Sequence, residues 1–137
     1  MAGELVVGYD GSDGSSAALT EAIALCKDLG SELVVVFGYG IPVPERESAD
    51  YREALHEVGQ ERTREALEQA RAQGVTARAE VVFERAAEAL VEAADKVDAR
   101  MIVGGSYGER PLAAAILGRT PHKLVSIARR PVLVVHR

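Results

Sequence analysis

The chain has 137 residues, the length of one domain, and its one cysteine excludes an intrachain disulfide and a cysteine-rich zinc site. Its net charge of -5 argues against a general nucleic-acid binder, because such domains usually carry a basic stripe. No apolar run approaches the roughly 20 residues of a membrane span, and the N-terminus lacks the pattern of a signal peptide. We therefore expect one cytoplasmic domain over residues 1–137, with no membrane partner.

Short apolar runs alternate along the chain with amphipathic stretches of helical length. Apolar residues spaced three and four apart indicate helices, and short runs bounded by turn residues indicate strands. In chain order the pattern predicts strand Glu4–Tyr9, helix Ser16–Leu29, strand Leu33–Phe37, helix Ala49–Gln73, strand Thr76–Phe83, helix Ala86–Val97, strand Met101–Gly104, helix Pro121–Ala128 and strand Pro131–His136.

Individual positions within these elements carry further expectations. Cys26 lies on the apolar face of its helix and is expected to be a packed, inert thiol. His56 is expected on the solvated surface of the long charged helix. The alternation of apolar and charged residues in Thr76–Phe83 is typical of an edge strand. The predicted buried stripe of the long helix is Leu55, Val58, Ala66, Leu67 and Ala70.

Alternating strands and helices of these lengths predict an α/β fold, an open five-stranded parallel sheet with helices on both faces. With Thr76–Phe83 at an edge, the natural strand order is 3-2-1-4-5, a Rossmann-like arrangement. The order reverses between strands 1 and 4, and ligands of such sheets bind beyond the carboxyl ends of the strands at that switch point.

Two glycine-containing loops follow those two strands. Asp10-Gly11-Ser12 follows the first strand, and Gly104-Gly105-Ser106 ends the fourth. The second loop continues through Gly108 and Gly118 to Thr120-Pro121, a signal for the start of a helix. Glycines that feed a helix N-terminus present backbone N–H groups to a phosphate. The spacing therefore predicts a phosphate-binding crevice between strands 1 and 4.

Four stretches resemble the universal stress protein family across essentially the whole chain: VGYDGSDGSSAAL, IVGGSYG, LGRTPHKLV and RRPVLVV. The resemblance implies a single universal stress protein domain of the adenine nucleotide alpha hydrolase-like fold, whose G-x2-G-x9-G-(S/T) motif holds ATP. It implies that Gly105, Gly108 and Gly118 are the motif glycines. Asp10 matches the aspartate that contacts adenine and ribose, and Gly38 matches a position beside the adenine.

The end of the motif departs from the family pattern. Arg119 stands where the family has the Ser or Thr that contacts phosphate, and Pro121 replaces the next small hydroxyl residue. Arg119 could grip a phosphate or point into solvent. Thr120 is better interpreted as the N-cap of the last helix. The terminal phosphate contacts therefore differ from those of the family.

Two functions remain in competition. The first is a nucleotide-binding regulatory protein of the stress response, holding ATP or another adenine nucleotide with or without Mg²⁺. The second is a family member that acts through protein contacts without a nucleotide. The chain shows no P-loop, nucleophile–base pair or metal-ligand cluster, so no enzymatic activity beyond slow, incidental ATP hydrolysis is expected. The predicted nucleotide-binding residues are Asp10, Gly11, Ser12, Gly38, Gly104, Gly105, Ser106, Gly108, Gly118, Arg119 and Thr120.

The last strand predicts a homodimer. Pro131–Val135 is an edge strand in the order 3-2-1-4-5, and its interior is apolar and β-branched, without a lysine. An exposed edge of this kind pairs readily with another strand. Pairing of two copies about a two-fold axis would cover both edges, and the family resemblance implies the same arrangement.

Overall fold

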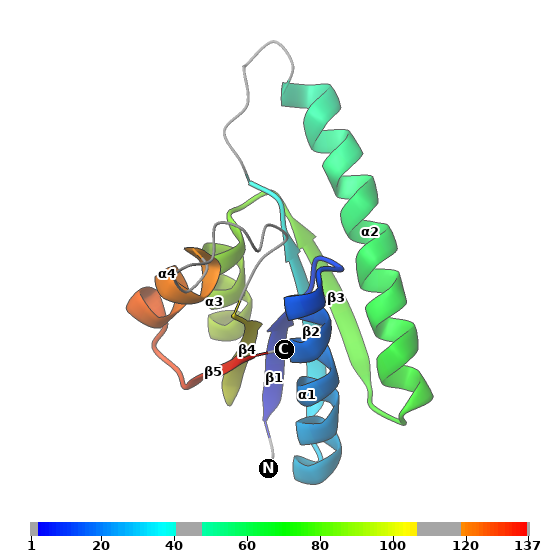
Figure 1. The fold of residues 1–137 in the computed structure, drawn as a ribbon, viewed down its shortest axis with the longest axis vertical. Coiled ribbons are helices and arrows are strands. Elements are labelled where there is room, and N and C mark those ends of the chain that lie inside the picture. The colour runs from blue at the N-terminus through cyan, green and yellow to red at the C-terminus, as the bar shows by residue number, and fades with distance from the viewer. Residues whose placement is uncertain (1–2, 41–47, 107–118, 137) are drawn as a thin grey trace.

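The computed structural model describes residues 3–40, 48–106 and 119–136, with Ser48 and Arg119 described in their backbone alone. Strands and helices alternate through these residues, and each of the first four strands is followed by a helix that returns the chain to the start of the sheet (Figure 1). The elements are β1 (Glu4–Gly8), α1 (Asp13–Leu29), β2 (Glu32–Gly38), α2 (Ser48–Ala72), β3 (Ala77–Val82), α3 (Ala86–Val97), β4 (Met101–Gly105), α4 (Arg119–Ile127) and β5 (Val132–Val135).

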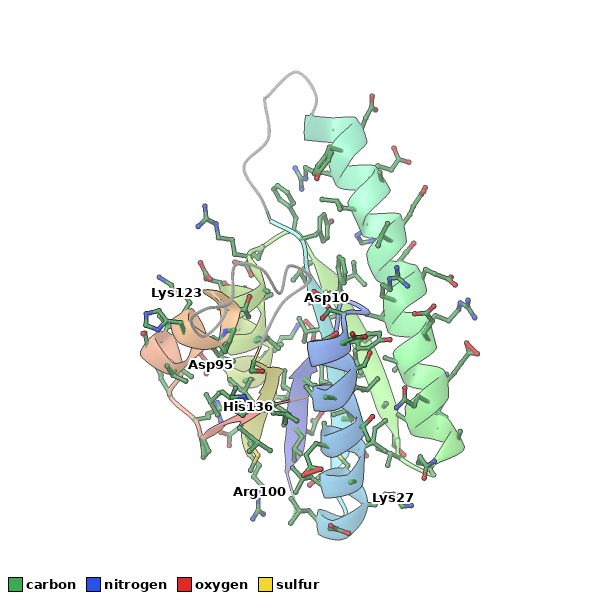
Figure 2. All side chains as sticks on the ribbon, viewed as in Figure 1. Asp10, Lys27, Asp95, Arg100, Lys123 and His136 are labelled. Atoms are coloured by element: carbon green, nitrogen blue, oxygen red, sulfur yellow. The ribbon has the colours of Figure 1, made fainter. Side chains whose placement is uncertain are left out.

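The five strands form one parallel sheet in the order β3-β2-β1-β4-β5, as predicted. β1 lies at the centre, where Val6 pairs with Val34 of β2 on one side and with Ile102 of β4 on the other. The order reverses at β1, so β1 and β4 border the switch point. Asp10 lies beyond the carboxyl end of the sheet, whereas Arg100 lies at its opposite end (Figure 2).

Alternation along the strands separates two apolar cores, one on each face of the sheet. Leu5, Val7, Leu33 and Val35 pack beneath α1 and α2, whereas Val6, Val34, Val36 and Ile102 pack beneath α3 and α4. Every one of these side chains is at most 2% exposed. Burial on both faces explains why β1 and β2 are continuous apolar runs in the sequence.

The buried face of α2 matches the predicted stripe only in part. Val58 is 44% exposed, while Thr63, Ala66 and Ala70 are buried. Gly59 faces the sheet so closely that a Cβ would lie 2.6 Å from Phe37 Cδ1 and 2.7 Å from Val81 Cγ1. Periodicity of apolar side chains thus placed Ala66, Leu67 and Ala70 correctly but not Val58. It also missed the small residues that mark the close approach of the helix to the sheet.

The structure also corrects the environment of His56. Its Nδ1 atom lies 3.0 Å from the hydroxyl of Tyr39, and the two rings meet edge to face at 5.7 Å. The side chain therefore belongs to an aromatic cluster at the end of β2 rather than to a solvated helix face. Cys26 is 1% exposed, and burial raises the pKa of its thiol to about 11, which confirms a packed, unreactive thiol.

The helix termini account for the other differences from the predicted elements. α1 begins at Asp13 because Ser12 is its N-cap, with the Ser12 hydroxyl accepting from the Ser15 N–H at 3.2 Å. α4 begins at Arg119, so Thr120 lies inside its first turn and is not the N-cap. Pro121 is tolerated there because N–H groups of the first turn have no intrahelical acceptor. In the described residues, no helix is long and apolar enough to cross a membrane.

Candidate functional site

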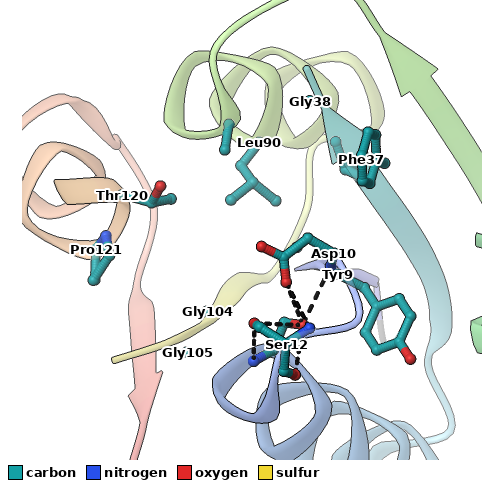
Figure 3. A pocket seen from close by; sticks show the side chains of 14 residues that line it. Tyr9, Asp10, Ser12, Phe37, Gly38, Leu90, Gly104, Gly105, Thr120 and Pro121 are labelled. Carbon is teal, nitrogen blue, oxygen red and sulfur yellow. Dashed lines mark hydrogen bonds between the residues drawn. The ribbon is translucent and has the colours of Figure 1, made fainter. Parts of the chain in front are cut away.

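A crevice opens at the carboxyl edge of the sheet, between the ends of β1 and β4 (Figure 3). The ends of β1, β2 and β4 and the first turns of α3 and α4 line it. It contains about 580 Å³ of space, counting the part open to solvent. Six predicted site residues line it: Asp10, Ser12, Gly38, Gly104, Gly105 and Thr120.

Asp10 is held by a hydrogen-bonded turn at the start of α1. Its Oδ1 atom accepts from the Ser12 N–H at 2.9 Å and from the Ser15 hydroxyl at 2.8 Å. The Asp10 N–H in turn points to the Ser15 hydroxyl at 3.2 Å. Both of these bonds to the carboxylate end on Oδ1, so the described residues leave Oδ2 available to a ligand (Figure 3). Asp10 therefore both closes the turn and presents an acceptor to the crevice.

Glycines at the ends of β2 and β4 allow neighbouring backbone segments to approach closely. A Cβ at Gly105 would lie 2.5 Å from the Gly14 carbonyl oxygen, at the N-terminus of α1. One at Gly38 would lie 2.8 Å from the Glu84 carbonyl oxygen. At Gly104 the nearest atom would be Leu124 Cδ2, an ordinary contact at 3.7 Å. Packing of the chain against itself is thus sufficient to require glycine at positions 38 and 105.

The connection from β3 to α3 forms the wall of the crevice beside Gly38. The Glu84 carbonyl oxygen accepts from the Gly40 N–H at 2.7 Å, and Ala86 lines the crevice. A hydrogen bond with Glu92, burial and the charges of Glu92 and Glu88 raise the pKa of the Glu84 carboxyl. This wall is therefore fixed mainly by backbone contacts, with an acidic outer side.

Ser106 ends the described part of the β4 loop in a buried position. The Ser106 N–H donates to the Val135 carbonyl oxygen at 3.1 Å, and the residue is fully buried. Its hydroxyl has no hydrogen-bond partner among the described residues. A buried hydroxyl without a partner is costly, so this oxygen is a candidate for a bond to a bound group. Ser106 itself is not among the residues that line the crevice, although its neighbour Gly105 is.

Other predicted residues are placed away from the crevice or outside the described residues. Gly11 has a φ of 86° and lies against Arg62 of α2. Gly108 and Gly118 lie outside the described residues, as does the Arg119 side chain. Arg130 precedes β5 at the opposite end of the sheet, where it bonds to Asp95, Asp98 and the Ala99 carbonyl oxygen.

Sequence reasoning missed several residues that shape the crevice. Leu90 of α3 lines it and lies 3.2 Å from the position of a Cβ on Gly8. Ser15 joins the Asp10 turn, and its place three residues after the N-cap Ser12 was an available signal. No local pattern marked Leu90, which comes from a distant helix. No group of three or more His, Cys, Asp or Glu among the described residues is arranged to hold a metal ion.

The fold and the crevice define a class of protein: Rossmann-like α/β domains with a small-molecule site at the switch point of a parallel sheet. The sequence model of the universal stress protein family matches residues 1–136. The chain belongs to the universal stress protein family. This agrees with the resemblance carried by its glycine-rich loops and its last strand.

Individual relatives agree with this assignment. A universal stress protein of Methanocaldococcus jannaschii is 30% identical, with 98% of this chain and 82% of the relative covered. A universal stress protein of Thermus aquaticus is 34% identical, with 96% of each chain covered. A crystal structure of a universal stress protein in complex with cAMP is 29% identical, with a TM-score of 0.72 over 99% of this chain and 98% of that one. The Rossmann-like fold is therefore shared along nearly the full length.

Proposed function

We propose that the crevice binds an adenine nucleotide, and that the protein is a nucleotide-binding regulator of the stress response. The observation that carries the proposal is the convergence of the Asp10 turn with the glycine end of β4 at the switch point. There, Asp10 Oδ2 is available to a ribose or base. The 29% identical structure in complex with cAMP supports the same class of ligand.

ATP or another adenine nucleotide would fill the crevice, with or without Mg²⁺. The apolar Leu90 and Val36 line the crevice together with the backbone at Gly38, an environment suited to a flat base. The first turn of α4 lies across the crevice, where Thr120 lines it. A phosphate near that turn would meet the positive end of the helix dipole. We propose Ser106, Gly108, Gly118 and Arg119 as further contacts, because they belong to the predicted motif loop and its continuation into α4.

Native mass spectrometry of protein purified without added nucleotide tests this proposal. We expect a fraction of the molecules to carry an adenine nucleotide, identified by its mass after release, and the remainder to take it up when ATP, ADP, AMP or cAMP is added. Protein that stays ligand-free with every one of these nucleotides would instead support a family member that acts through protein contacts.

We also propose that the protein forms a homodimer through its last strand. The Ile102 N–H donates to the Pro131 carbonyl oxygen, and the Ser106 N–H to the Val135 carbonyl oxygen, so the odd-numbered residues of β5 face β4. Because backbone groups alternate along a strand, Val132 and Val134 direct their N–H and C=O groups to the free edge. A second copy of β5 is the natural partner for this edge.

A further inference from the structure

The β1–α1 loop has two sides, and only one of them faces the crevice. Asp10 and Ser12 line the crevice from this loop. The other side faces α2, and there the loop presents the bare backbone of Gly11. Its φ of 86° lies in the left-handed region that favours glycine. The loop that carries the ligand-facing carboxylate therefore has no side chain of its own at this point to anchor it on the outer side.

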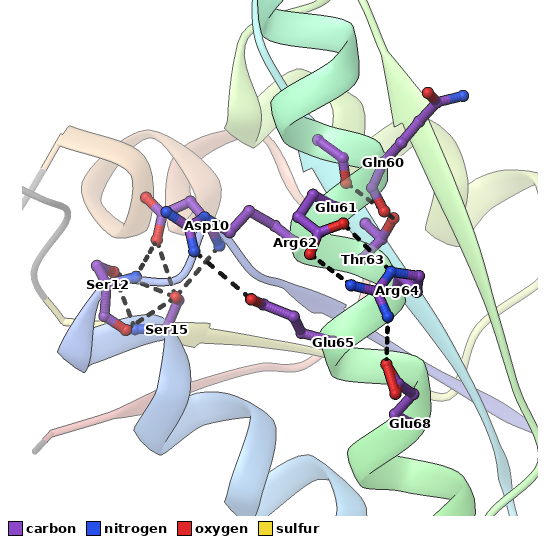
Figure 4. Close-up of polar contacts among 11 residues, drawn as sticks. Asp10, Ser12, Ser15, Gln60, Glu61, Arg62, Thr63, Arg64, Glu65 and Glu68 are labelled. Carbon is purple, nitrogen blue, oxygen red and sulfur yellow. Dashed lines mark hydrogen bonds and ion pairs between the residues drawn. The ribbon is translucent and has the colours of Figure 1, made fainter.

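Arg62 of α2 covers this exposed backbone. The place of a Cβ on Gly11 lies 3.0 Å from both Cδ and Nε of Arg62 and 3.2 Å from Cζ, so the arginine occupies the space that a side chain would take. Figure 4 shows the Arg62 side chain extending from α2 toward the Asp10 turn. The Arg62 guanidinium also forms an ion pair with Glu65, in which Nη1 and Oε1 are 3.5 Å apart.

Arg62 belongs to the flank of α2 that faces α1. Farther along this flank, Gln69 Nε2 lies 3.5 Å from the Thr20 hydroxyl, and Gln73, just beyond the end of α2, accepts from the Lys27 ammonium at 3.4 Å. These contacts tie α2 to the body of α1. Near the start of α1, the same flank meets the loop instead of the helix, and Arg62 lies against Gly11 there.

We infer that Arg62 is a positioning residue of the nucleotide site. By packing against Gly11, it holds the β1–α1 loop in place, so that Asp10 keeps its orientation toward the crevice. The loop lies between two supports, the hydrogen bonds to Ser12 and Ser15 on one side and the Arg62 side chain on the other. The inference rests on the proposed nucleotide binding for its effect on affinity. The effect of Arg62 on the order of the loop is expected in the nucleotide-free protein as well.

The expected effect on affinity is modest, because Arg62 does not line the crevice. Its ion pair is partly exposed, with 42% of each side chain accessible, and such pairs add little to global stability. Without Arg62, the loop would be less ordered before binding, and the cost of ordering it would reduce affinity. We expect Arg62→Ala to weaken nucleotide binding by roughly three- to tenfold.

Hydrogen exchange followed by NMR measures the loop directly in the nucleotide-free protein. The amides of Ser12 and Ser15 report the loop, because they donate to Asp10 Oδ1 and to the Ser12 hydroxyl. In Arg62→Ala these amides should exchange several-fold faster, while that of Ala22 in the interior of α1 should be unchanged. The matched control is Arg64→Ala, which removes an arginine that pairs with Glu61 and Glu68 within α2.

Calorimetric titration of the same variants with ATP and AMP completes the test. Arg62→Ala should weaken both nucleotides, Arg62→Lys should restore part of the loss, and Arg64→Ala should match the parent. Unchanged Ser12 and Ser15 exchange in Arg62→Ala would overturn the inference. So would parental nucleotide affinity in that variant. A parent protein that binds no nucleotide would refute the proposed function instead, and the exchange rates would still decide the role of Arg62.

Discussion

At the scale of single residues, the site depends on one carboxylate with two separate tasks. Asp10 closes its own turn through Oδ1 and presents Oδ2 to the crevice. The turn contacts use only the acceptor character of one oxygen, which an amide oxygen can reproduce. Ligand binding through Oδ2 requires an acceptor that an amide nitrogen cannot supply. The two tasks can therefore be separated by substitution.

Asp10→Asn should preserve the turn and weaken nucleotide binding. A hydrogen bond to a charged group contributes about 1.5–3 kcal/mol, so the loss of affinity should reach about tenfold or more. Asp13→Asn is the matched control, because it makes the same change of charge on an exposed residue of α1 outside the crevice. Calorimetry gives the affinities. Equal affinity of Asp10→Asn and the parent would exclude Asp10 as a ligand contact.

The adjacent glycines of β4 should differ sharply in their tolerance of a methyl group. Gly105→Ala would bring its Cβ to 2.5 Å from the Gly14 carbonyl oxygen, whereas Gly104→Ala meets Leu124 Cδ2 at 3.7 Å. Overpacking typically costs about 1–3 kcal/mol, so we expect Gly105→Ala to lose that much and Gly104→Ala less than about 1 kcal/mol. Urea unfolding measures both, and equal losses would contradict the packing explanation.

At the scale of elements, the packing of α2 is set by its small residues. Gly59 faces Phe37 and Val81, and Thr63 is buried farther along the same face, where its hydroxyl donates to the Gly59 carbonyl oxygen at 2.8 Å. Glycine weakens a helix, so its presence at a buried position indicates that the close approach to the sheet outweighs the propensity cost.

Gly59→Ala should therefore destabilise the protein despite improving helix propensity. The gain in propensity is about 1 kcal/mol, whereas overpacking against the sheet costs about 1–3 kcal/mol. Gln60, the exposed neighbour of Gly59, provides the control, because Gln60→Ala changes helix propensity at a position that does not pack on the sheet. Thermal and urea unfolding should rank Gly59→Ala below both Gln60→Ala and the parent. A more stable Gly59→Ala would show that α2 can move away from the sheet freely.

The sequence predicted the regular parts of the structure because their patterns are local. Apolar runs marked four of the strands, and the alternating edge pattern of Thr76–Phe83 marked the other and led to the correct strand order. The turn at Asp10 was also visible locally. The buried face of α2 was visible only in part, because Gly59 and Thr63 carry no apolar signal. Leu90 and Arg62 reach the site region from helices far along the chain, so no local pattern could place them there.

At the scale of the whole molecule, β5 leaves one edge of the sheet without a neighbour in the described part of the chain. Val134→Pro removes an N–H that points to the free edge, so β5 should stay paired with β4 while a dimer through this edge is lost. Light scattering should report a folded monomer for this variant and a dimer for the parent.

A control separates this effect from a general loss of apolar surface. Val125→Lys replaces a valine of α4 that is 52% exposed, and it should leave the dimer intact. A parent protein that is monomeric at tens of micromolar would contradict the proposed dimer. A dimer that persists in Val134→Pro would place the interface on another surface.

The central claim is that the crevice between β1 and β4 binds an adenine nucleotide. Calorimetric titration of the parent protein with ATP, ADP, AMP and cAMP, with Asp10→Asn titrated alongside, tests it most directly. The predicted result is a saturable heat at one site per chain for at least one of these nucleotides, weakened about tenfold or more in Asp10→Asn. No heat from any of them at millimolar concentration would contradict the claim.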